Sequence, residues 1–119
     1  MRQPGHRVRV RLGYEVQYPD PLRVSAGDPV SVGREDPELP GWKWCKGPDG
    51  REGWVPVELL SNEGLDAVVL QDYSARELAV EPGELVVVED ARHNWLLVRN
   101  TRGERGWIPA SNTEPTDIE

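Results

Sequence analysis

The sequence predicts an all-β protein made of two small five-stranded barrels that follow one another in the chain. Two observations support this fold class. The 119 residues include 12 Gly and 11 Pro, and these turn formers interrupt every apolar run before it reaches the length of a typical helix. The second observation is an internal repeat, which divides the chain into two copies that are small but still large enough to fold.

The repeat becomes visible when the chain is aligned with itself. The matching blocks, first copy before second, are residues 22–28 (LRVSAGD) and 78–84 (LAVEPGE), Trp42 and Trp95, and residues 53–56 (GWVP) and 106–109 (GWIP). The offset between the copies falls from 56 in the first block to 53 in the last. The difference of three residues therefore lies in a loop, residues 33–41 against 89–94, where insertions cost little free energy.

Each copy is expected to consist of short strands joined by tight turns. The expected strands are residues 7–12, 30–34, 42–46 and 52–56 in the first copy and residues 65–70, 84–89, 95–100 and 105–109 in the second. Residues 47–50, Gly-Pro-Asp-Gly, are typical of a hairpin turn, and Arg102 and Gly103 supply the equivalent turn in the second copy. Short strands at this spacing, joined by tight turns, are typical of a small five-stranded barrel.

Side-chain alternation indicates how two of these strands face. In residues 7–12, arginines alternate with Val8, Val10 and Leu12, so one face of the strand is basic and the other apolar. In residues 42–46, Trp42 and Trp44 fall on one face, and Cys45 falls on the other. We expect Cys45 to be a buried, unreactive thiol, because a free cysteine away from histidine behaves as a small apolar side chain.

These elements give expected domain boundaries. The first barrel covers residues 6–61 and the second covers residues 64–113, and residues 61–64 form a linker too short for the barrels to tumble freely. Residues 114–119 are acidic and are expected to form a solvated tail.

Charge and composition restrict the function. The formal net charge of −7 disfavours binding to nucleic acids or anionic membranes. The single cysteine and the spacing of the two histidines match no disulfide, metal site or nucleophilic triad. We expect a non-enzymatic protein without cofactor or metal, and a cytoplasmic location because no signal peptide or membrane-spanning run is evident.

A series of short motifs recurs in order in both copies. In the second copy these are residues 69–73 (VLQDY), Glu77 before Leu78, residues 83–84 (GE), Trp95, and the block at 106–109; in the first they are Tyr14, Asp20 before Leu22, residues 27–28 (GD), Trp42, and the block at 53–56. In the order and spacing of these motifs, each of the two copies resembles the Src homology 3 family, and together they cover nearly the whole chain.

The resemblance implies a groove of aromatic side chains that receives extended, proline-rich peptides, which are already ordered and so lose little entropy on binding. The positions that match the family's groove and acidic loop are Tyr14, Tyr18, Asp20, Trp42 and Pro56 in the first copy, and Tyr73, Glu77, Trp95 and Pro109 in the second. Four positions where tyrosine is expected hold Leu12, Leu59, Gln71 and Asn112 instead. The first copy keeps the longer acidic loop and is expected to be the better binder.

We therefore expect an adaptor whose protein or peptide ligand is bound at short, extended segments of that ligand. Two alternatives remain open at this point. One is a cell-wall or glycan-binding module of the bacterial type, and the other is a structural subunit whose grooves are filled by self-association.

Overall fold

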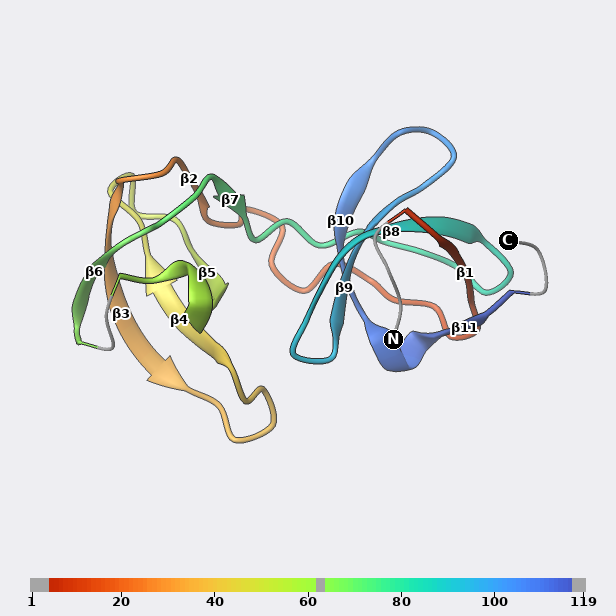
Figure 1. The fold of residues 1–119 in the computed structure, drawn as a ribbon, viewed down its shortest axis with the longest axis horizontal. Coiled ribbons are helices and arrows are strands. Elements are labelled where there is room, and N and C mark those ends of the chain that lie inside the picture. The colour runs from red at the N-terminus through yellow and green to blue at the C-terminus, as the bar shows by residue number, and fades with distance from the viewer. Residues whose placement is uncertain (1–4, 62–63, 117–119) are drawn as a thin grey trace. The chain divides into compact units, whose positions relative to one another are not determined.

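A computed structural model describes residues 5–61 and 64–116 (Figure 1). Within them the regular structure is β apart from two 3-10 helices, which confirms the all-β prediction. The strands are β1 (Arg7–Val10), β2 (Arg23–Val24), β3 (Pro29–Glu35), β4 (Trp42–Lys46), β5 (Glu52–Pro56), β6 (Asp66–Val68), β7 (Tyr73–Ser74), β8 (Leu85–Arg92), β9 (Trp95–Arg99), β10 (Arg105–Pro109) and β11 (Thr113–Pro115). The 3-10 helices are η1 (Val57–Leu59) and η2 (Ala110–Asn112).

The chain forms two compact units, and each unit contains residues from both sequence repeats. The described part of unit 1 is residues 5–17 and 77–116, and that of unit 2 is residues 18–61 and 64–76. The chain therefore passes from one unit to the other twice, after Gln17 and after Arg76.

Unit 1 is built on one antiparallel sheet with the strand order β10-β9-β8-β1-β11. Strand β1 lies between β8 and β11, so that Val8 is opposite Val86 on one side and Pro115 on the other. Figure 1 shows the red β1 with the blue-green β8 and the blue β11. Of the apolar face predicted for residues 7–12, Val8 and Val10 are buried in the core, but Leu12 is 49% exposed because β1 ends at Val10. The core residues are Val8, Val10, Leu78, Val80, Val86, Val88, Leu96, Val98 and Ile108.

Unit 2 contains a four-stranded sheet with the order β5-β4-β3-β6 and a two-stranded ribbon of β2 and β7. Strand β6 pairs with β3, with Ala67 opposite Val30. Strand β7 pairs with β2, with Tyr73 opposite Val24. The buried apolar residues of this unit include Leu22, Val24, Val30, Val32, Cys45, Val55, Leu59, Leu60, Ala67 and Val69.

The two repeats have exchanged their first segments, so the boundaries of the packed units differ from the expected barrels at residues 6–61 and 64–113. The first segment of repeat 1 pairs in unit 1, where Tyr14 forms a bridge with Val80. The first segment of repeat 2 pairs in unit 2, where Tyr73 lies opposite Val24. Tyr14 and Tyr73 occupy equivalent positions in the two repeats, as do Val24 and Val80. The exchange is sterically possible because each repeat offers the other an edge at equivalent positions, Val80 to Tyr14 and Val24 to Tyr73.

Two smaller expectations also change. The acidic tail predicted from residue 114 starts later, because Glu114 lies in β11, opposite Arg9. Residues 117–119 of that tail, and residues 62–63 of the predicted linker, fall outside the described residues. The loop expected at residues 89–94 is shorter, since β8 continues to Arg92 and only His93 and Asn94 connect it to β9. Both connecting residues have positive φ, as a tight hairpin turn requires.

None of the helices within the described residues has the length and apolar character needed to cross a membrane.

Candidate functional site

The candidate site lies in unit 1, around the rings of Tyr14 and Trp95. Their centroids are 5.8 Å apart and the rings are nearly perpendicular, at 84°, an arrangement that aromatic pairs favour. Pro109 on β10 lies directly opposite Trp95 on β9. All three side chains are half-buried. The site is composite, because Tyr14 belongs to the first repeat and Trp95 and Pro109 belong to the second.

The backbone fixes each of these side chains. Trp95 is the first residue of β9, directly after the His93–Asn94 turn, and the carbonyl of Asn94 accepts a hydrogen bond from the Ala110 N–H at 2.9 Å. That bond ties the turn to the start of η2, next to Pro109. Tyr14 is held by two backbone hydrogen bonds with Val80, each 3.0 Å long.

Glu77 is buried and is hydrogen-bonded to Tyr14. Its side chain is only 8% exposed. One carboxyl oxygen accepts a hydrogen bond from the Tyr14 hydroxyl at 2.6 Å, and the other accepts one from the Gln17 backbone N–H at 2.5 Å. From the sequence, Glu77 was expected in an acidic loop that selects basic ligands. In the structure its carboxyl group instead holds the Tyr14 hydroxyl.

Asn112 supports the same site and was noted in the sequence only as a departure from the family pattern. Its side-chain amide donates hydrogen bonds to the carbonyls of Leu12 and Gly13, at 3.3 and 3.0 Å. The Arg11 Nε donates to the Ser111 carbonyl at 3.0 Å. These bonds fasten the segment before Tyr14 to η2. The sequence signal that could have revealed Asn112 is the polar residue at an expected aromatic position.

The equivalent residues of unit 2 are buried. Trp42 is 5% exposed and Tyr73 is 8% exposed, and Pro56, opposite Trp42 in the β4–β5 register, is fully buried. The Tyr73 hydroxyl donates a hydrogen bond to the Trp54 carbonyl at 2.7 Å. These three predicted site residues are thus buried, whereas their counterparts in unit 1 are half-buried, so we take the aromatic residues of unit 1 as the candidate site.

The remaining two predicted site residues lie at the surface of unit 2. Tyr18 is 37% exposed, and its ring centroid is 5.0 Å from that of Trp44. Asp20 forms an ion pair with Arg51 at 2.9 Å. Neither residue shares a unit with Tyr14, although all three lie within seven positions of one another in the sequence.

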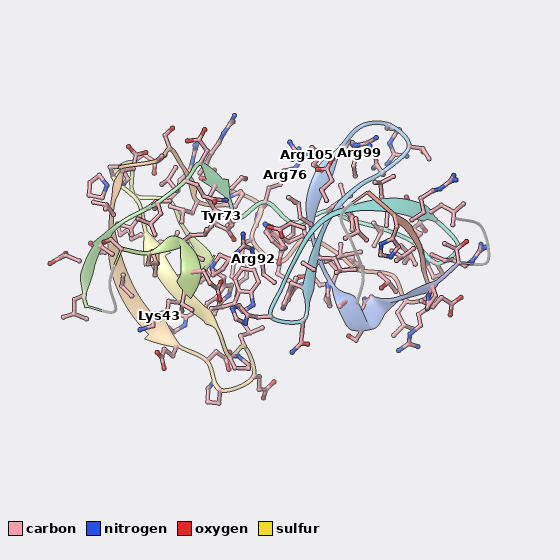
Figure 2. The ribbon with its side chains drawn as sticks, viewed as in Figure 1. Lys43, Tyr73, Arg76, Arg92, Arg99 and Arg105 are labelled. Atoms are coloured by element: carbon pink, nitrogen blue, oxygen red, sulfur yellow. The ribbon has the colours of Figure 1, made fainter. Side chains whose placement is uncertain are left out.

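Charged side chains of unit 1 form ion pairs both between strands and along β8. The guanidinium groups of Arg99 on β9 and Arg105 on β10 both donate to Glu89, with Nε to oxygen distances of 3.1 and 2.6 Å; Figure 2 shows the two arginines on these neighbouring strands. Burial raises the pKa of the Glu89 carboxyl, but the two arginines lower it more, so its pKa lies below the ordinary value. At the end of β8, Arg92 pairs with Asp90 at 3.0 Å and lies opposite Trp95.

The described residues offer no group of three or more His, Cys, Asp or Glu side chains that could hold a metal ion. Cys45 is fully buried, as predicted, and burial raises the pKa of its thiol to about 11 despite the nearby positive charge of Lys43. Such a thiol is a poor nucleophile at neutral pH.

The sequence profile of the variant SH3 domain matches residues 7–63 and, a second time, residues 67–116. The two matches cover nearly the whole chain and coincide with the two sequence repeats. No match was found among curated proteins or among solved structures. SH3 domains are generally protein-interaction modules and are typically not enzymes. The chain belongs to the variant SH3 domain family and carries two copies in tandem.

Proposed function

We propose that the protein is a non-enzymatic adaptor in which unit 1 binds an extended segment of another protein across Tyr14, Trp95 and Pro109. The observation that carries this proposal is the pairing of Tyr14 with Trp95 at 5.8 Å on a half-buried surface. Two aromatic rings and a proline present rigid apolar area at a small entropic cost.

The ligand suited to this surface is a peptide in the polyproline II conformation. Such a peptide has no internal hydrogen bonds and presents prolines and apolar side chains along one edge, which can pack between aromatic rings. The indole N–H of a tryptophan can donate to a peptide carbonyl while the ring packs against a proline. We expect an affinity in the micromolar range, equivalent to about −8 kcal/mol.

Selection of a basic residue in the ligand cannot rest on Glu77, because its side chain is 8% exposed and is bonded to Tyr14 and Gln17. The exposed Glu15, next to Tyr14, is the acidic residue nearest in sequence to the composite site. We assign it the role of attracting a basic residue of the ligand, through a solvent-exposed interaction that weakens with salt.

The test is a titration of the full chain with a proline-rich peptide selected from a library, measured by calorimetry. Replacing Trp95 by Ala is expected to weaken binding by at least about fivefold, the loss typical of a central aromatic residue. The matched control is Trp44→Ala, which removes a half-buried tryptophan from unit 2 and is expected to leave the affinity unchanged. Equal affinity of the Trp95→Ala variant and the unchanged protein would rule out the site.

A double-mutant cycle tests the composite nature of the site. Tyr14→Ala is expected to weaken peptide binding to a similar extent, although Tyr14 and Trp95 belong to different repeats. Because the two rings are in contact, the effect of the double variant should be smaller than the sum of the single effects. Additive effects would mean that the residues bind at separate places, and urea unfolding of each variant separates lost binding from lost fold.

A further inference from the structure

Unit 2 carries a corner of two indole rings on the outside of its sheet. Trp44 on β4 and Trp54 on β5 lie directly opposite each other in the strand register. Their ring centroids are 5.1 Å apart and the rings are inclined at 72°. The guanidinium carbon of Arg34 lies 4.7 Å from the centroid of Trp44 and 5.5 Å from that of Trp54. Both distances are within the range of cation–π attraction.

A bulge in β3 brings Arg34 to this corner. Val32 is opposite Cys45 and Glu35 is opposite Lys43, so Gly33 and Arg34 together face Trp44. A side chain at Gly33 would approach the Trp44 carbonyl to 3.1 Å. The glycine therefore lets β3 run close to β4 at this point, and the extra residue directs the Arg34 guanidinium onto the two rings.

One carboxyl group contacts the corner, and the unit as a whole has a net negative charge. The indole N–H of Trp44 donates a hydrogen bond to the Glu52 carboxyl group at 2.7 Å. The chain segment of unit 2, residues 18–76, has 11 acidic residues against 6 basic ones, so its formal charge is −5. The Tyr18 ring, 37% exposed, adds a third aromatic surface next to Trp44. Aromatic faces and negative charge together attract organic cations.

Unit 1 lacks this arrangement although it has the same strand register. Trp107 on β10 is opposite Leu97 on β9, so one indole is replaced by a leucine. The bulge of β8 carries Glu89, which pairs with Arg99 and Arg105. The indole corner is therefore a property of unit 2 and does not follow from the fold that the two units share.

We propose that the corner of Trp44 and Trp54 is a binding site for a weakly hydrated organic cation, a guanidinium or alkylated ammonium group of a ligand, and that Arg34 occupies it as an internal competitor. Without the Arg34 guanidinium the faces of the two rings become accessible to a ligand, while the Glu52 carboxyl group stays hydrogen-bonded to Trp44. The ligand cation then makes the contacts that Arg34 makes in the unliganded protein. This site is separate from the composite site of unit 1 and does not depend on the proposed function.

The test uses tetramethylammonium chloride as the probe and the full chain, with binding followed by NMR through the indole N–H signals. Those of Trp44 and Trp54 are assigned from the Trp44→Leu and Trp54→Phe variants. Arg34→Ala is expected to bind the probe at least about fivefold more tightly than the unchanged protein, the effect of losing one cation–π competitor. The Trp95 signal should not move, which distinguishes this site from the peptide site.

Two controls make the result decisive. Arg23→Ala removes the same charge from an exposed position of unit 2 and is expected to bind the probe no better than the unchanged protein. In the Arg34→Ala/Trp44→Leu variant, which copies the Leu97 of unit 1, the gain should disappear. The proposal is overturned if the Trp44 and Trp54 signals of Arg34→Ala do not shift, or if sodium chloride at the same concentration shifts them equally.

Discussion

Cys45 is a single residue whose chemistry follows from its place in β4. It is opposite Val32 on one side and Gly53 on the other, and its side chain is fully buried. The surrounding apolar groups disfavour the thiolate, and the charge of Lys43 compensates only in part, so the pKa rises from 9.0 to about 11.

This pKa predicts an alkaline loss of stability. Because the folded thiol holds its proton more tightly than the unfolded one, the contribution is fully present below pH 9 and is lost as the pH rises to 11. The shift corresponds to about 2 to 3 kcal/mol. Urea unfolding of the protein and of Cys45→Val, between pH 8 and 11, measures it. The variant copies Val98 of the second repeat and should lack this part of the pH dependence; identical profiles would contradict the raised pKa.

Glu77 and Asn112 show what sequence can predict about single residues of the site. The motif order predicted Tyr14, Trp95 and Pro109 as site residues, and the structure brings the rings of Tyr14 and Trp95 together and places Pro109 opposite Trp95. The same motif order assigned Glu77 to ligand selection. In the structure its carboxyl group accepts hydrogen bonds from the Tyr14 hydroxyl and the Gln17 N–H. Those two donors come from the other repeat. No local pattern around Glu77 contains them, so its role could not be predicted from its own loop.

At the scale of elements, the glycine that opens each Gly-Trp-x-Pro block allows a neighbouring segment to approach its strand. A side chain at Gly106 would meet the backbone of Glu77 and Leu78 at 2.6 to 2.8 Å. A side chain at Gly53 would meet Ala75 Cβ at 2.7 Å and Leu22 Cβ at 3.1 Å. Gly53 is in the first repeat and Ala75 in the second, so this contact exists only because the segments are exchanged.

A suppressor substitution tests that contact. Gly53→Ala is expected to destabilise the protein by about 2 to 3 kcal/mol, since it overfills a packed position. Adding Ala75→Gly removes the nearer clash and should recover part of the loss, while Leu22 prevents full recovery. Urea unfolding gives the free energies, compared as a cycle with Ala75→Gly alone.

The matched control is Gly106→Ala, whose clash is with backbone atoms. Ala75→Gly should give it no recovery. If Ala75→Gly also fails to rescue Gly53→Ala, the two residues are not in contact and β7 does not pack where the structure places it.

Strand positions were largely predictable, whereas strand partners were not. The expected strands at residues 42–46, 52–56 and 105–109 coincide with β4, β5 and β10, because alternation and turn residues are local signals. Pairing is not local. Residues 7–12 can pair with the edge of either repeat, since Tyr14 faces Val80, whereas the equivalent Tyr73 faces the equivalent Val24. A repeated sequence leaves that choice open.

At the scale of the whole molecule, the exchange means that each unit depends on both repeats. Unit 1 takes β1 from the first repeat, and unit 2 takes β6 and β7 from the second. Strand β1 is an interior strand of its sheet, between β8 and β11, so its removal would leave one edge of each neighbouring strand unpaired and would take Val8 and Val10 out of the core.

Cleavage between the repeats tests this arrangement directly. A protease site inserted between Ser61 and Gly64 splits the chain into its two sequence repeats. Because the exchanged segments hold the halves together without a covalent link, we expect both fragments to elute as one particle of about the uncut size in size-exclusion chromatography, with separation only in denaturant.

The unmodified chain under the same protease serves as the control for cutting elsewhere. Separation of the two fragments in native buffer would show that each repeat is packed as an independent barrel. Light scattering of the uncut chain identifies the case in which segments are exchanged between two molecules, since the particle would then have twice the mass.

The position of β1 also sets an order of events during synthesis on the ribosome. Val8 is paired with Val86 and with Pro115, which is 107 positions later. Strand β1 must therefore wait until residue 115 has been synthesised before its sheet is complete, while residues 18–76 can complete unit 2 earlier. Contacts so distant in sequence form slowly. During that interval the exposed valines of β1 are a natural point at which a chaperone would act on the nascent chain.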